Sequence, residues 1–324
     1  MKKIVSVIAL SFLLCSNTFG VTLKVGVLAP EGTNWSNSLK KMAKEIRKKT
    51  NKKVKIKFYF GGSQGDEPDV LRKIRVGQLH GGIFTGKTLG DINGDVRVIE
   101  LPFTFFHDRK KALGIVEKME PFFNKKFEQN EFKNLGFFEI GNVYFVSQKK
   151  TDSLENMKGV KIWSWEGDTL VSTMIETMKF VSVPLPLPDV LSSLSTGIIQ
   201  AAYAPPLGII SLQWNTKIKY VIDLPISFSV GAFLLSDKAW AKVKPEHRKT
   251  VEDIARKYVK EVNSGNDKDN QDALAAMKGQ GIEFLKFTNE DVERGKVLRK
   301  EVIGKLKGKL FSAEALTKLE NNLK

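Results

Sequence analysis

The chain has 324 residues, of which 42% are hydrophobic, and its 52 Lys or Arg against 36 Asp or Glu give a formal net charge of +16. Its only cysteine, Cys15, lies near the N-terminus, so the rest of the chain cannot form a disulfide, a thiolate metal site or a cysteine nucleophile. The lysines are dispersed rather than gathered among stacking aromatic residues, so we expect no nucleic-acid partner, with attraction to anionic lipid headgroups as a weaker alternative.

Residues 1–20 are predicted to be a secretory signal. Two lysines precede an apolar stretch at residues 4–14, which is too short to span a bilayer, and small residues then stand before a cut at Val21. We favour this cleaved signal over a lipoprotein anchor at Cys15, because Leu14 stands where such a site needs a small residue, and over a retained anchor. The protein is therefore expected in the periplasm.

The first part of the chain alternates strands and helices. Apolar alternation predicts strands at residues 23–27 and 54–60, and a third short strand at residues 81–84. A helix that begins at Trp35 and a short helix that carries Val70, Leu71 and Ile74 lie between them. This order predicts an α/β domain with a mainly parallel sheet.

The rest of the chain repeats the theme and then becomes helical. The predicted strands are 137–147, 160–165, 199–203, 219–224 and 227–236. The predicted helices are 168–178, a segment near 189–195, a long stretch from Pro245, 289–306 and 313–323. Three prolines suggest a break at residues 184–188. Two α/β lobes with a helical C-terminal wrap fit this pattern.

The sequence lacks the patterns of the common catalytic and metal sites. The three histidines, His80, His107 and His247, are isolated from one another, and there is no nucleophile elbow or phosphate-binding loop. Asp66 and Glu67 are adjacent on a turn, where capping the next helix explains them better than a paired-carboxylate mechanism. We therefore expect neither an enzyme nor a protein with a metal or cofactor.

Five motifs in a fixed order point to a family. They are GTNW (32–35), FYFGGSQGDEPDVLRKIRVGQL (58–79), ELPFTF (100–105), DSLENMKGVKIWSWEGD (152–168) and VPLPLPDVLSSLSTGIIQAAY (183–203). With them, residues 21 to about 263 resemble the solute receptors of tripartite ATP-independent periplasmic (TRAP) transporters, the DctP type.

The resemblance implies a periplasmic-binding-protein-like α/β fold, with two lobes around a central cleft and long C-terminal helices. Lobe I would comprise residues 21–139 plus about 221–245, and lobe II residues 140–220 plus about 246–324. It also implies that the lobes close around a small organic solute, which the large and small membrane subunits then transport with an ion gradient. Such receptors are monomers or weak dimers.

The chain departs from the family at the positions that hold an acidic solute. The family's lysine-isoleucine-arginine reads Lys161-Ile162-Trp163 here, and tryptophan cannot form the charged fork that a carboxylate favours. A second family arginine is missing from the segment around residues 141–144, and the family's later polar pair is replaced by AAYAPP (201–206).

These departures define the candidate ligand-binding residues. An aromatic and proline-rich group is expected in the cleft: Trp35, Trp163, Trp165, Tyr203, Pro205 and Trp214. Polar candidates at the strand ends are Gln64, Thr85, Asn142 and Tyr144. We expect a ligand more apolar than a C4-dicarboxylate, because burial of an unpaired carboxylate is costly.

Alternatives remain open on both the ligand and the function. The tryptophans could be ordinary core residues, with another cation as the anchor for an acid. The protein could also serve another transport or sensor system, or carry hydrophobic molecules through the periplasm.

Overall fold

The computed structural model describes residues 20–324, so all of the predicted secretory signal except its last residue, and with it Cys15, lies outside this range. In the described part of the chain, no helix is long and apolar enough to cross a membrane.

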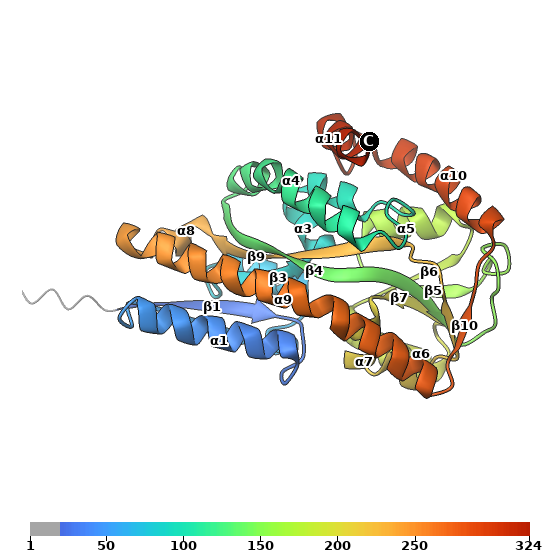
Figure 1. Cartoon of the computed structure of the whole chain (residues 1–324), viewed down its shortest axis with the longest axis horizontal. Coiled ribbons are helices and arrows are strands. Elements are labelled where there is room, and N and C mark those ends of the chain that lie inside the picture. The colour runs from blue at the N-terminus through green and yellow to red at the C-terminus, as the bar shows by residue number, and fades with distance from the viewer. Residues whose placement is uncertain (1–19) are drawn as a thin grey trace, which may run out of the picture.

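A mixed sheet runs through the whole molecule (Figure 1). Its strand order is β2-β1-β3-β9-β4-β7-β5-β6, and β8 pairs with both β4 and β10. The strands are β1 (Val21–Val27), β2 (Val54–Tyr59), β3 (Gly81–Thr85), β4 (Phe132–Ser147), β5 (Lys161–Trp165), β6 (Val181–Leu185), β7 (Ala201–Ala204), β8 (Tyr220–Ile222), β9 (Ser227–Ser236) and β10 (Glu283–Leu285).

The sheet has two parallel parts joined by two long antiparallel strands. On one side β1 pairs in parallel with β2 and β3, and on the other β5 pairs in parallel with β6 and β7. Between them, β4 pairs antiparallel with β9 and β7. The expected parallel sheet is thus confirmed for the two outer parts, and the carboxyl ends of their strands are where a ligand site is expected.

Helices cover both faces of this sheet (Figure 1). They are α1 (Asn34–Lys49), α2 (Glu67–Arg75), α3 (Gly86–Ile92), α4 (Arg109–Glu128), α5 (Thr169–Thr177), α6 (Val190–Thr196), α7 (Pro206–Ser211), α8 (Asp237–Trp240), α9 (Pro245–Gly279), α10 (Asn289–Leu306) and α11 (Ala313–Leu323). Three 3-10 helices carry residues of the site: η1 (Gly94–Glu100), η2 (Leu187–Asp189) and η3 (Trp214–Thr216).

Helix α9 spans the molecule, as Figure 1 shows, with contacts to α1, β4 and α7 along its length. Its predicted apolar face is buried, including Val251, Ile254 and Tyr258. Near the middle it meets a bulge in β4, where the ladder shifts register between Glu139 and Gly141. A bulge leaves backbone groups without strand partners.

Three asparagines of α9 supply those missing partners. Asn263 donates to the Phe137 carbonyl at 3.0 Å and accepts from the Glu139 amide at 2.9 Å. Asn266 donates to the carbonyls of residues 139 and 140, both at 3.0 Å, and Asn270 also reaches residue 140. The spacing of these asparagines puts them on one helix face, so α9 fixes the strand that joins the two parts of the sheet.

The structure adds elements that the sequence analysis did not include. Helices α3, α4 and α7 were not predicted, and α4 contains Pro121. The segment expected as a break includes the end of β6, which contains Pro184. Because β6 lies at the sheet edge, Pro184 needs no ladder partner for a missing N–H.

The proposed lobe boundaries stay a prediction. Helix α10 contacts α5, which lies in the predicted lobe II. Helix α11, also assigned to lobe II, instead contacts α4 and η1, which lie in the predicted lobe I.

Candidate ligand-binding cleft

A cleft of about 250 Å³ lies between the two parallel parts of the sheet. Its first wall consists of residues 27–30, Thr33, Trp35, Glu67, residues 83–87, Arg97 and Glu100. Its second wall consists of Trp163, Trp165, Asp168, Leu170, Val171, Met174, Leu187, residues 203–205, Leu207, Gly208, Ser211, Leu212 and Trp214. Residues of β4, β9 and α9 close the space between the walls, including Ile140, Val143, Ser227 and Asn266.

Aromatic rings fill much of the second wall. Trp163 stacks on Tyr203 with ring centroids 4.8 Å apart and meets Trp214 edge-on at 5.4 Å. Trp163 and Trp214 are only 2% and 1% exposed. The Trp163 indole N–H donates to the Leu185 carbonyl at 3.0 Å, which ties β5 to β6. The position expected to hold a charged anchor is thus a packed, apolar surface.

The structure brings three more predicted residues to the cleft. Trp35 lies on the first wall and packs edge-on against Phe138 at 4.8 Å. Thr85 ends β3, and Pro205 precedes α7 on the second wall. Together with Trp163, Trp165, Tyr203 and Trp214, they make seven of the ten predicted site residues part of the lining.

Three predicted residues lie outside the lining. Gln64 is in the loop before α2, where its carbonyl accepts from Lys73. Past the bulge in β4, it is Val143 that lines the cleft, and Asn142 and Tyr144 do not. Burial raises the pKa of Tyr144 to about 12. The bulge changes which side chains the strand presents, and no sequence alternation reveals that shift.

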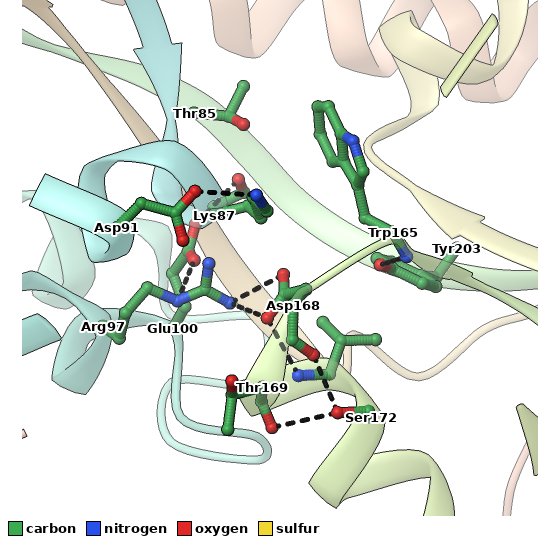
Figure 2. A network of polar contacts seen from close by, with 12 residues as sticks. Thr85, Lys87, Asp91, Arg97, Glu100, Trp165, Asp168, Thr169, Ser172 and Tyr203 are labelled. Atoms are coloured by element: carbon green, nitrogen blue, oxygen red, sulfur yellow. Dashed lines mark hydrogen bonds and ion pairs between the residues drawn. The ribbon is translucent and has the colours of Figure 1, made fainter. Parts of the chain in front are cut away.

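A buried ion pair spans the cleft (Figure 2). The Arg97 Nη2 of η1 donates to both carboxylate oxygens of Asp168, at 2.9 and 3.0 Å. The Asp168 carboxylate also caps α5 by accepting from the Val171 amide at 3.1 Å. Arg97 is 3% and Asp168 6% exposed. Since Arg97 belongs to the first wall and Asp168 to the second, the pair holds the walls together.

Glu100 completes this group from the first wall. Its carboxylate lies 3.2 Å from Arg97 Nε in an ion pair, although Nε makes no hydrogen bond. It also accepts from the Ser229 hydroxyl and the Val230 amide. Burial raises the pKa of Glu100 despite Arg97, while for Arg97 burial is outweighed by Asp168 and Glu100, so its pKa is raised. Arg97 is therefore charged and already neutralised.

The second cation of the lining, Lys87, also has an acidic partner. Its ammonium group donates to Asp91 at 2.7 Å, one turn along α3, as Figure 2 shows. Helix α3 starts at Gly86, which leaves no room for a side chain, because an added Cβ would lie 1.9 Å from a Glu100 carboxylate oxygen. Both cations that face the cleft are thus paired with carboxylates of the protein itself.

Glu67, at the start of α2, is a buried carboxyl group on the first wall. It accepts hydrogen bonds from the Thr85 amide and hydroxyl at 3.0–3.1 Å, and is 2% exposed. Desolvation dominates over these bonds and raises its pKa to about 8. Glu67 is therefore largely uncharged at neutral pH.

A second bond between the walls lies next to Glu67. The Trp165 indole N–H donates to the Asp66 carboxylate at 2.9 Å, and Asp66 also caps α2 by accepting from the Glu67 amide. On the other side of Trp165, its backbone amide donates to the Tyr203 hydroxyl at 3.3 Å. Asp66 therefore both caps α2, as expected, and links the walls.

Sequence reasoning missed the charged residues of the lining. Arg97 and Lys87 carry no motif, and 71 residues separate Arg97 from Asp168. The only signal was a single arginine in the otherwise apolar run before the ELPFTF motif. In the described residues, no group of three His, Cys, Asp or Glu could hold a metal ion. The arrangement is suited to enclosing an organic molecule.

Comparison with known proteins places the chain in a family. Residues 25–307 match the model of the DctP family, bacterial extracellular solute-binding protein family 7. A solute-binding protein of Verminephrobacter eiseniae is 18% identical over 266 residues, which are 82% of this chain and 79% of the relative.

Solved structures show the same fold. A TRAP periplasmic solute binding protein from Haemophilus influenzae with bound L-gulonate has a TM-score of 0.85 at 20% identity, over 93% of this chain and 99% of that chain. Another, from Desulfovibrio salexigens with bound orotic acid, has a TM-score of 0.84 at 18% identity, over 93% and 98%. The chain therefore belongs to the DctP family of bacterial extracellular solute-binding proteins, and its fold is that of the solved TRAP receptors.

Proposed function

We propose that the protein captures an uncharged, weakly polar organic solute and delivers it to the membrane subunits of an ion-gradient-driven TRAP transporter in the periplasm. The observation that carries the ligand class is the pairing of both cleft cations, Arg97 with Asp168 and Lys87 with Asp91. A ligand carboxylate would enter a space whose positive charges are already neutralised. It would therefore be desolvated without a free cation to compensate.

The rest of the lining supports the same class. The aromatic second wall offers flat apolar surface, and Ser211 and Ser227 add hydroxyl groups for orientation. An engineered apolar cavity of about 150 Å³ takes up benzene. The larger cleft here, about 250 Å³, suits a somewhat larger molecule such as a substituted aromatic or a branched aliphatic compound.

The solved relatives named above bind acids, so the test must include acids. The protein is purified natively, denatured, and the released small molecules are identified by mass spectrometry. We expect a molecule without a carboxylate. Calorimetric titration then compares methyl benzoate with benzoate, a pair that differs in charge, alongside D-glucuronate. Recovery of a carboxylic acid, or tighter binding of the acids than of the ester, would contradict the proposed ligand class.

A further inference from the structure

We infer that Asp168 is a built-in substitute for a ligand carboxylate: it occupies Arg97, and thereby excludes acidic solutes from the cleft. This inference rests on the proposed ligand class. It attributes the exclusion of acidic solutes to Asp168, so that substitution of this one residue should let the cleft accept them.

Arg97 and Asp168 meet in the lining of the cleft, where a solute would bind. Arg97 is 3% exposed, lines the cleft, and is the one arginine among the described lining residues. Its guanidinium donates toward the opposite wall, where Asp168 accepts at 2.9 and 3.0 Å (Figure 2). A solute acid held between the walls would need the same donor. Asp168 therefore competes with such a solute for the same group.

The Arg97 guanidinium already has two acidic neighbours. Glu100 lies 3.2 Å from the Nε of Arg97, so two carboxylates already face one guanidinium. A third carboxylate there would meet like charges in a buried space, which is strongly unfavourable. Removal of Asp168 would leave Arg97 with Glu100 alone and would open space beside the guanidinium.

Arg97 keeps unused donor capacity. Asp168 is bound through Nη2 only, and the buried Nε makes no hydrogen bond. A carboxylate that is free to move could use the planar fork more fully than Asp168, whose position is fixed by its cap on α5.

The test uses Asp168→Ser, because serine still caps a helix but removes the charge and leaves room. We expect D-glucuronate to bind this variant about ten- to a hundredfold more tightly than it binds the wild type, the range of one charge-assisted hydrogen bond. Acetate should raise the melting temperature of the variant more than chloride at equal ionic strength. The double variant Arg97→Gln/Asp168→Ser should lose both responses.

Asp66→Ser is the matched control. Asp66 also caps a helix and also bonds the opposite wall, but its partner is the neutral indole of Trp165, so its loss should create no acetate response. If Asp168→Ser does not fold in chloride, the acetate response is measured as the recovery of its helical circular dichroism when acetate replaces chloride. An absent response in Asp168→Ser, or an equal one in Asp66→Ser, would overturn the inference. Tight binding of D-glucuronate to the wild type would overturn the proposed ligand class and the inference with it, whereas the two outcomes above would overturn the inference alone.

Discussion

Glu67 gives the protein a pH-dependent stability that one substitution should remove. Its pKa is about 8 in the folded protein and 4.5 in the reference state, so the folded state holds a proton that the unfolded state releases. Stability is then fully present below about pH 4.5 and falls as the pH rises toward 8, by at most about 1.4 kcal/mol per pH unit. Glu67→Gln should remove the Glu67 share of this slope, as measured by urea unfolding at pH 5, 6.5 and 8. Glu100 and Glu139, whose pKa values burial also raises, should keep their shares.

The control for this experiment is Glu45→Gln. Glu45 is bonded to Lys257 and Tyr258, which lower its pKa, so its ionised form stabilises the fold. Its substitution should leave the slope above pH 5 unchanged. Equal slopes for wild type and Glu67→Gln would show that Glu67 is ionised in the folded protein.

At this scale the sequence predicted residue types better than residue partners. Trp163 stood out because it replaces an expected arginine, and the structure places it in the lining. Arg97 did not stand out, because its meaning depends on Asp168, which comes near only through the fold. Asn142 and Tyr144 lie outside the lining, beyond the bulge in β4, a backbone feature without a local sequence signature.

Among the elements, η1 is held against the C-terminal segment too closely for any side chain at Gly94. A Cβ there would lie 1.7 Å from the Leu310 carbonyl oxygen, a backbone atom that cannot turn away. We expect Gly94→Ala to lower the free energy of unfolding by about 1–3 kcal/mol. Gly265→Ala is the control: it lies inside α9 with open space around it, so it should stabilise by up to about 1 kcal/mol. Denaturant unfolding measures the change in the free energy of unfolding for both variants. Changes of the same sign would show that the space at Gly94 does not control stability.

The contact between α9 and β4 allows a second test at this scale. Asn263→Ala would leave the Phe137 carbonyl and the Glu139 amide without their partner, and should cost about 1–3 kcal/mol. Ser264→Ala, next in the chain, loses only an exposed bond to the Lys260 carbonyl in its own helix and should change little. Urea midpoints compare the two. A similar small effect would mean that water replaces Asn263.

Most elements could be predicted because their apolar periods are clear, as in α1 and α9. Helix α4 was absent from the prediction although its buried residues recur at helical spacing, and it contains Pro121. The edge strand β6 was obscured in the same way by Pro184. Pro184 is tolerated because β6 is an edge strand, a tertiary fact that a local pattern does not contain.

For the whole molecule, the ordered motifs were sufficient to predict the fold, and the family match confirms it. What they could not supply was the state of the cleft. The two bonds between its walls, from Arg97 to Asp168 and from Trp165 to Asp66, join segments that are distant in sequence. We expect these bonds to supply part of the free energy that holds the walls together without a solute.

Trp165→Phe tests this view of closure, because it removes the indole donor and keeps an aromatic ring. Loss of one hydrogen bond of about 1 kcal/mol should shift the open–closed equilibrium roughly fivefold toward open. Cysteines at the exposed residues Val76 and Ile198 would carry dyes for single-molecule energy transfer, in a chain that starts at Val21 and so lacks Cys15.

Trp163→Phe is the matched control for that experiment. It loses an indole bond to the Leu185 carbonyl within one wall, so it should lower stability without changing the distance distribution. If both variants open the molecule equally, aromatic packing controls closure. If neither does, the bond to Asp66 contributes nothing to it, and the Arg97–Asp168 pair alone joins the walls in the absence of solute.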